Sequence, residues 1–162
     1  MLTRLDPQRA ATAIFVVALL SIAGALIIES LGYKPCELCL LQRWAYYIGV
    51  PLAGAAALTA RGGKTNAASA LLAAFALLFF ANGLLGLYHT GVELHYWRGP
   101  EACTGAYQAA RDAGDFLKQM QETKVVRCDE VALRLLGLSM STWQAIAAFF
   151  LSTVAFFGWR KS

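Results

Sequence analysis

Two cysteines three residues apart, Cys36 and Cys39, carry the clearest chemistry in this sequence, and Arg43 follows four residues after the second. A thiol pair at this spacing can close a small disulfide ring, bind a metal or transfer electrons. Pro35 suits a first helical position, and a helix that begins there gathers both thiols and the arginine on one face. The helix N-terminus and the nearby cation both favour the thiolate. The alternative is a pair of cysteines that only pack in the interior.

The composition is that of a membrane protein. Of the 162 residues, 58% are apolar and 15% are charged, which lies well outside ordinary soluble composition. The net charge is +4, but the cations lie beside apolar runs and form no basic patch interleaved with exposed aromatic residues. We therefore expect a single integral membrane domain, residues 1–162, that contacts the lipid bilayer and binds no nucleic acid.

Four apolar runs are long enough, or nearly so, for the roughly 20 residues that a membrane-spanning helix needs. The expected spans are residues 10–28, 44–60, 67–87 and 143–159. The first run exceeds the core of a secretory signal, which is about 7–15 residues long, so we interpret it as a span. The expected fold class is an all-α membrane protein, a four-helix transmembrane bundle, with outer connections at residues 29–43 and 88–142.

Four spans put both termini on one side of the membrane, and the cations indicate which side that is. The termini and the turn between the second and third spans carry Arg4, Arg9, Arg61, Lys64, Arg160 and Lys161. The outer connections mix acidic with basic residues, and Glu29, at the edge of the first span, is expected to be solvated. Because basic residues accumulate on the inner side, both termini are expected to be cytoplasmic.

All four cysteines then lie on the outer side, with Cys36 and Cys39 in the first connection and Cys103 and Cys128 in the second. In bacteria this side is oxidising, so disulfides form and persist there. We hypothesise the pairs Cys36–Cys39 and Cys103–Cys128. Sequence alone permits three pairings of four cysteines.

The second outer connection contains two helical patterns. Between residues 106 and 121, apolar residues recur near helical spacing with polar residues on the other face. This pattern predicts a short amphipathic helix on the membrane surface, and the alternative is a helix that packs on its own loop. Residues 131–138 are expected to form a second short helix that leads into the last span.

Thiols gathered on one side of a membrane can relay electrons by thiol–disulfide exchange. A pair in an outer loop can meet a soluble partner, and a pair at the membrane surface can pass electrons to an acceptor in the lipid. The chain has no glycine fingerprint of a dinucleotide site, so a bound dinucleotide is not expected. A lipid-soluble acceptor such as a quinone would reach Cys39, and Arg43 would stabilise charge that develops on the quinone oxygens.

The run from Cys36 to Arg43, the four spans and the later cysteine pair resemble the DsbB family of disulfide bond formation proteins over nearly the whole chain. The resemblance implies an enzyme of the bacterial inner membrane, a thiol:quinone oxidoreductase. It would reoxidise a periplasmic, thioredoxin-fold, DsbA-like dithiol oxidase and pass the electrons to ubiquinone or menaquinone. No metal cofactor is expected.

The resemblance also implies roles for single residues. Cys103 is similar to the cysteine that the partner attacks, and Cys128 is similar to its mate, which exchanges with Cys36. Cys39 is similar to the cysteine that engages the quinone, and Arg43 to the arginine beside it.

His89, at the end of the third span, matches a family histidine near the quinone. The alternative is that this histidine is a solvated side chain at the interface. The segment between Cys103 and Cys128 shares spacing more than residues with the better-known family members, which leaves the partner open.

Three other interpretations keep some of these features. A DsbI-like oxidoreductase with a dedicated partner, or an analogue of vitamin K epoxide reductase, retains the redox chemistry. A four-cysteine zinc site would use all thiols, but Cys103 and Cys128 are not closely spaced and thiols on this side tend to oxidise. A small transporter would need ionisable groups inside its spans, and none lies away from their edges.

Overall fold

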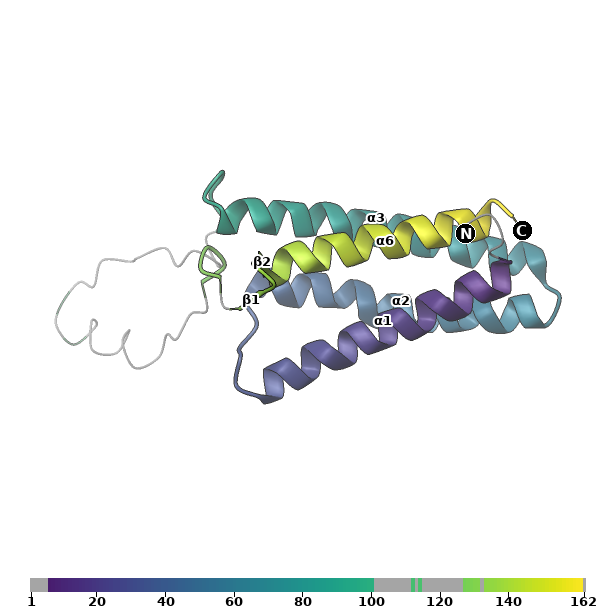
Figure 1. Ribbon diagram of the computed structural model, residues 1–162, viewed down its shortest axis with the longest axis horizontal. Helices are drawn as coiled ribbons and strands as arrows, with labels where there is room; N and C mark the ends of the chain where they lie inside the picture. The colour runs from purple at the N-terminus through teal and green to yellow at the C-terminus, as the bar shows by residue number, and fades with distance from the viewer. Residues whose placement is uncertain (1–5, 101–111, 113, 115–126, 132, 162) are drawn as a thin grey trace.

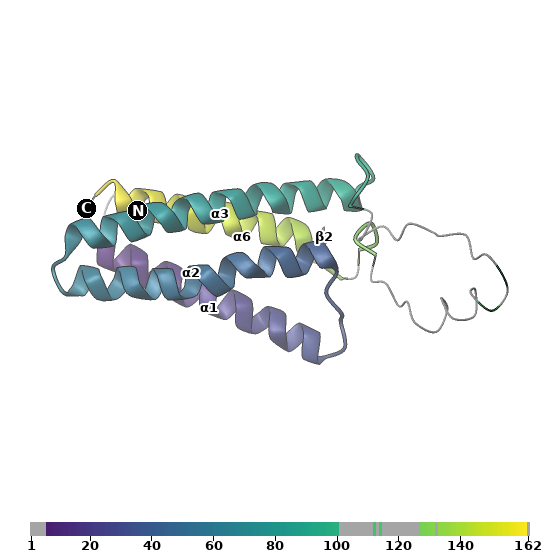
Figure 2. The same ribbon diagram turned by 180° about the vertical axis from the view of Figure 1, so that it is seen from behind.

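The computed structural model describes residues 6–100, 112, 114, 127–131 and 133–161. In chain order the elements are α1 (Pro7–Ser30), α2 (Glu37–Arg61), α3 (Thr65–Glu93), β1 (Arg134–Leu135), β2 (Leu138–Ser139) and α6 (Met140–Trp159). The four long helices run side by side along the molecule (Figure 1). The start of α1 and the end of α6 lie at one end, and the α1–α2 connection and the hairpin lie at the other (Figure 2). The expected helical bundle is confirmed for the described residues.

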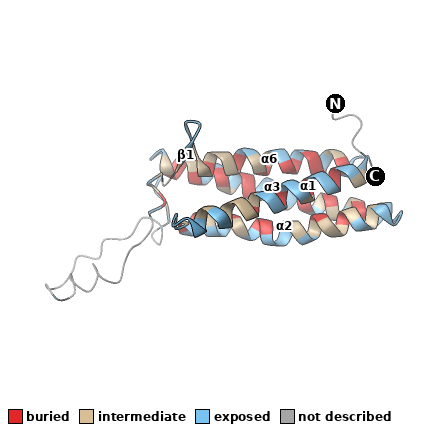
Figure 3. Ribbon diagram, turned by 60° about the horizontal axis from the view of Figure 1, so that its bottom comes forward, coloured by how far each residue is buried: buried red, intermediate tan, exposed pale blue. Residues whose placement is uncertain are grey.

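The exterior of the bundle is apolar. Each long helix carries buried residues on one side and exposed residues on the other (Figure 3). The exposed residues include Leu20, Leu58, Leu77 and Phe150, one from each helix and each more than half exposed. Among the described helices, α1, α3 and α6 are long and apolar enough to cross a membrane. Since such an exterior suits lipid rather than water, the fold is that of a membrane helical bundle.

Helix α2 is less apolar than the other three, and as a fourth span it stays a prediction. Arg43 and Arg61 bracket 17 uncharged residues, and these include a tryptophan, two tyrosines and Pro51, which lies inside the helix. These residues lower the mean hydropathy of the segment. Its outward apolar side chains, such as Ile48 and Leu58, are nevertheless exposed like those of the other helices.

The helices extend beyond the expected spans at the end of the bundle opposite the termini. Residues 37–43 and 88–93, which were expected to belong to the connections, are helical. Pro35 lies outside α2 rather than at its first position, because Cys36 is the N-cap and its sulfur accepts the backbone N–H of Cys39 at 3.4 Å. The thiol pair therefore occupies the cap and the first turn of a long helix.

The expected helix over residues 131–138 is wrong. Strands β1 and β2 form an antiparallel hairpin in which Arg134 faces Ser139. Leu136 and Gly137 form the turn with φ values of 52° and 84°, the left-handed conformation that two-residue hairpin turns require. Glycine adopts it without steric cost. The amphipathic helix expected at residues 106–121 lies outside the described residues, apart from two isolated positions.

Gly86→Ala is expected to destabilise the bundle by about 1–3 kcal/mol. An added Cβ would lie 2.9 Å from the Cα and Cβ of Ala145, so α3 and α6 would have to move apart. Thermal unfolding in detergent, followed by circular dichroism, measures the effect. Gly24→Ala in α1 is the control, because nothing lies within 4 Å of a Cβ there and helix propensity favours alanine by about 1 kcal/mol. Equal melting temperatures for the two variants would contradict this account of the α3–α6 contact.

Candidate functional site

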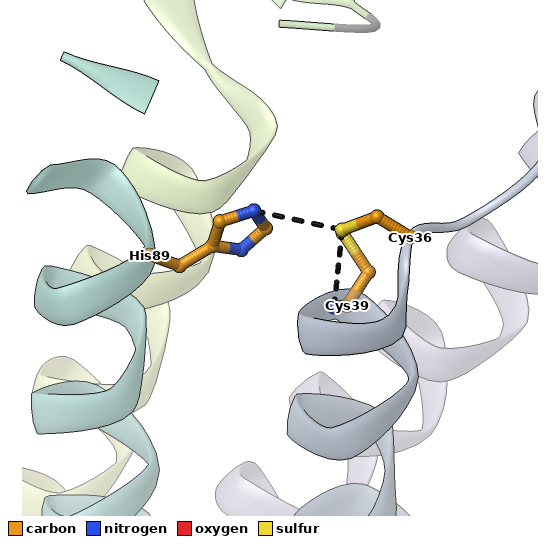
Figure 4. A group of neighbouring side chains, drawn as sticks. All are labelled: Cys36, Cys39 and His89. Atoms are coloured by element: carbon orange, nitrogen blue, oxygen red, sulfur yellow. Dashed lines mark hydrogen bonds between the residues drawn. The ribbon is translucent and has the colours of Figure 1, made fainter. Parts of the chain in front are cut away.

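The two thiols of the Cys-x-x-Cys pair meet at the N-terminal end of α2 (Figure 4). Both are free, and their Sγ atoms lie 3.1 Å apart. A disulfide bond is about 2.05 Å long, so the structure holds this pair in the dithiol form and the Cys36–Cys39 disulfide stays a prediction for the oxidised form. Cys36 is buried and Cys39 is half-buried. Cys39 is thus the more exposed of the two thiols.

His89 reaches this pair from α3. Its Nε2 atom lies 3.6 Å from the Sγ of Cys36, and its Nδ1 atom lies 3.3 Å from the side-chain nitrogen of Gln42. The imidazole is 1% exposed and Gln42 is 4% exposed. The alternative of a solvated interfacial histidine is therefore wrong, because α2 and α3 enclose the ring between the thiol and the amide.

A carboxylate lies behind the histidine. The Oε1 atom of Glu93 is 3.8 Å from His89 Nε2, one helical turn along α3, and both side chains are nearly buried. Ser141, in the first turn of α6, donates its hydroxyl to the other oxygen of Glu93. Gln42, Glu93 and Ser141 were not among the site residues predicted from the sequence. The spacing of four between His89 and Glu93 is the signal that could have found the carboxylate.

Arg43 is bound to a carboxylate rather than free. Its Nη1 atom lies 2.5 Å from an Oε2 of Glu29 at the end of α1, and its side chain is only 10% exposed. The expectation of a simply solvated Glu29 is therefore incomplete, since this side chain is 42% exposed yet carries the ion pair. The pair joins the ends of α1 and α2 beside the thiols and keeps the guanidinium at the wall of the cavity.

One cavity of about 470 Å³ connects these groups. Residues of α1, α2, α3 and α6 and of the outer segments line it, among them Leu20, Ile28, Cys36, Cys39, Gln42, Arg43, Tyr46, His89, Glu93, Met140, Trp143 and Gln144. The volume is within the usual range for a small-molecule site, which is about 300–1,000 Å³. Gln144 accepts the Tyr46 hydroxyl at 3.0 Å, but its buried Nε2 has no hydrogen-bond partner among the described residues. The cavity wall therefore offers an unused donor.

Cys128 brings the second cysteine pair to the first. It is 1% exposed and belongs to the same buried cluster as Cys36, Leu38 and Val92. Cys128 is also disulfide-bonded. Cys103 lies outside the described residues, so the pairing Cys103–Cys128 stays a prediction.

The surroundings of Cys36 lower the pKa of its thiol to about 4. The hydrogen bond with the Cys39 thiol makes the largest contribution, and burial opposes it. The hydrogen bond with His89 and the backbone N–H of Cys39 lower the pKa further. In the dithiol form, Cys36 is thus the member of the pair that carries the negative charge at neutral pH.

Alkylation of Cys36 in the reduced protein should therefore depend little on pH. A thiol whose pKa is about 4 is fully ionised from about pH 6 to pH 8 and loses its charge only as the pH falls through 4. Its rate with iodoacetamide should change less than about twofold over this interval, whereas an ordinary cysteine accelerates roughly 75-fold. Mass spectrometry of the Cys36 peptide measures this rate. A steep rise towards pH 8 would show that the thiolate is not held by these contacts.

The structure brings four of the sequence-predicted site residues to one cavity, namely Cys36, Cys39, Arg43 and His89, and it brings Cys128 against the first of them. In comparisons with known proteins, the family model described as "Disulfide bond formation protein DsbB" matches residues 7–158. No curated protein and no solved structure gives a significant match. Because the family model covers nearly the whole chain and its cysteine chemistry is present in the site, this chain belongs to the DsbB family of membrane proteins that form disulfide bonds.

Proposed function

We propose that this protein is an inner-membrane thiol:quinone oxidoreductase that reoxidises a periplasmic DsbA-like dithiol protein and passes the electrons to ubiquinone or menaquinone. The proposal includes four spans, with α2 as one of them, and cytoplasmic termini. The observation that carries it is the shared cavity, in which two free thiols face His89 and lie beside Arg43. The inner cysteine pair and an acceptor dissolved in lipid would come into contact in this cavity.

The protein side of the reaction is a relay of two disulfide exchanges. A thiolate of the partner attacks the Cys103–Cys128 disulfide at Cys103, which forms a mixed disulfide and frees Cys128 as a thiolate. The partner's second thiolate then attacks its own sulfur in that mixed disulfide, so that the partner leaves with a disulfide and Cys103 becomes a thiolate. Cys128 attacks Cys36 in the Cys36–Cys39 disulfide, and Cys39 leaves as a thiolate. Cys103 next closes the outer disulfide again, which leaves Cys36 and Cys39 as thiols. The burial of Cys128 in one cluster with Cys36 supports exchange between the two cysteine pairs, because it puts them in the same part of the fold.

The cavity suits a quinone by its chemistry. The group accepts two electrons and two protons when bound, and its ring oxygens are hydrogen-bond acceptors only. Two donors line the cavity and would donate to such oxygens, the guanidinium of Arg43 and the unpartnered Nε2 of Gln144. His89 and Glu93 can hold protons next to the thiols. The apolar α1 residues that line the cavity, such as Leu20 and Ile28, suit the hydrocarbon part of a lipid-soluble molecule.

A coupled assay tests the proposal. Purified protein in detergent is mixed with a reduced thioredoxin-fold dithiol protein and a soluble analogue of ubiquinone or menaquinone, and quinone absorbance and free thiols are followed together. We expect one quinone to be consumed for each disulfide made in the partner. Partner oxidation that continues without any quinone would overturn the proposal. Turnover with one dedicated partner and not with a general dithiol oxidase would favour the DsbI-like alternative.

Arg43→Ala is expected to raise the quinone concentration for half-maximal rate about tenfold and to leave the maximal rate nearly unchanged. The change removes a hydrogen bond from a charged donor, worth about 1.5–3 kcal/mol. Arg61→Ala is the matched control, because it removes the same side chain from the exposed C-terminal end of the same helix. If the two variants give the same quinone dependence, Arg43 does not contact the acceptor.

A further inference from the structure

Three potential metal ligands converge at the outer end of the cavity. The Sγ atoms of Cys36 and Cys39 and a ring nitrogen of His89 all lie within 4.8 Å of one another, and Figure 4 shows the imidazole directed at the sulfur of Cys36. We propose that the reduced pair and His89 form a binding site for a thiophilic divalent cation of the Zn²⁺ class, which withdraws both thiols from exchange. This inference goes beyond the proposed function and does not depend on it, because it requires only the dithiol form.

The distances fit a tetrahedral ion closely. Bonds of about 2.3 Å to sulfur and about 2.0–2.1 Å to nitrogen put two sulfurs about 3.8 Å apart and a sulfur and a nitrogen about 3.6 Å apart. The observed distance from Cys36 Sγ to His89 Nε2 is 3.6 Å, and the sulfurs are 3.1 Å apart. The Cys36–His89 distance therefore already suits an ion, and the sulfurs need to separate by about 0.7 Å. The third distance, between Cys39 Sγ and the ring nitrogen, lies within 4.8 Å, so rotation of the Cys39 side chain completes the set.

The second shell supports the imidazole as a ligand. Metal-bound histidines usually hold their other ring nitrogen in a hydrogen bond, which fixes the ring orientation. Gln42 lies 3.3 Å from Nδ1 of His89 and is itself buried. Its amide can present either nitrogen or oxygen to the ring after a half-turn, so its oxygen can accept a hydrogen bond from the Nδ1–H group when Nε2 binds an ion.

The fourth position faces a carboxylate. Glu93 Oε1 lies 3.8 Å from His89 Nε2 and lines the same cavity. Two thiolates, an imidazole and one further oxygen form a donor set that zinc accepts. At neutral pH binding releases the proton of the Cys39 thiol, because Cys36 is already a thiolate, and it transfers no electrons. A disulfide offers no thiolate, so the site exists only when the inner pair is reduced, and the cation competes with reoxidation.

Cobalt absorption tests the site without any enzyme activity. Full-length protein that carries Cys103→Ser and Cys128→Ser has only the inner thiols left, and it is titrated with Co²⁺ in its reduced and oxidised forms. We expect one Co²⁺ per chain, with a thiolate-to-cobalt band, in the reduced form only, and displacement of that band by Zn²⁺. His89→Phe should weaken binding at least about 30-fold, because it removes a ligand. His95→Phe is the matched control, because His95 is exposed and lies outside the group of three ligands.

Equal binding by the oxidised form, or equal affinities of the His89→Phe and His95→Phe proteins, would overturn the proposal. If His89→Phe does not fold, alkylation of the protein with an intact His89 decides the question. Zn²⁺ should then protect Cys36 and Cys39 from iodoacetamide at least about tenfold, and a chelator should restore their reactivity. Absence of protection would overturn the site. A failed quinone assay would leave each of these results unchanged.

Discussion

Cys39→Ser is expected to abolish sustained quinone reduction, with a loss of at least about a thousandfold in turnover. A serine oxygen cannot form a disulfide with Cys36, so the inner pair can no longer carry two electrons. The outer pair is left intact. The variant should therefore oxidise one equivalent of partner per chain, by means of the Cys103–Cys128 disulfide, and then stop.

Rapid mixing of the variant with reduced partner measures this single equivalent, and quinone absorbance on the same sample should stay constant. Continued turnover after the first equivalent would contradict the assignment of Cys39. If the variant oxidised no partner at all, the Cys103–Cys128 disulfide would not be the one that exchanges with the partner. The two readouts thus examine the inner and outer pairs independently in one protein.

The two inner cysteines differ in their surroundings. Cys36 is buried at the helix cap, next to His89 and in one cluster with Cys128, whereas Cys39 is in the first turn, is less buried and packs only against the edge of that cluster. These contacts favour Cys36 as the inner cysteine that exchanges with another protein sulfur. When Cys128 binds Cys36, the remaining thiolate is Cys39, one turn before Arg43 on the same helix. We therefore assign exchange to Cys36 and electron transfer out of the protein to Cys39 as parts of the same proposal.

The local features of the site could be predicted from the sequence. The spacing of Cys36, Cys39 and Arg43 requires one helix face, and the structure has these residues at the start of α2, lining one cavity. The long apolar runs predict the helices, because hydrophobic length alone indicates a span. Each of these inferences uses residues that are neighbours along the chain.

The parts that sequence reasoning missed depend on contacts between helices. Gln42 meets His89 across 47 positions of the chain, and Ser141 reaches Glu93 across 48. Such contacts follow from the packing of α2, α3 and α6, which no local pattern encodes. The hairpin was missed for another reason, since Gly137 terminates an apolar run that resembles a short helix. The shared cavity is therefore a result of the fold.

Cys103→Ser is expected to give the opposite defect to Cys39→Ser, with catalytic oxidation of the partner reduced at least about a thousandfold and the inner pair still open to a quinone. The partner has no Cys103 sulfur to attack, so electrons cannot enter from outside. Four thiols in the reduced natural chain make two disulfides and should consume two equivalents of quinone. Three thiols in the variant make one disulfide and should consume one equivalent.

Stoichiometric reoxidation after removal of a chemical reductant gives these numbers directly. The comparison with Cys39→Ser is its control, because that variant also has three thiols but lacks the cysteine proposed to face the acceptor. It should consume quinone far more slowly than Cys103→Ser, although both proteins can form one disulfide. Equal rates for the two variants would mean that the position of the thiol, one turn before Arg43 at the cavity wall, does not determine which sulfur delivers electrons to the lipid phase.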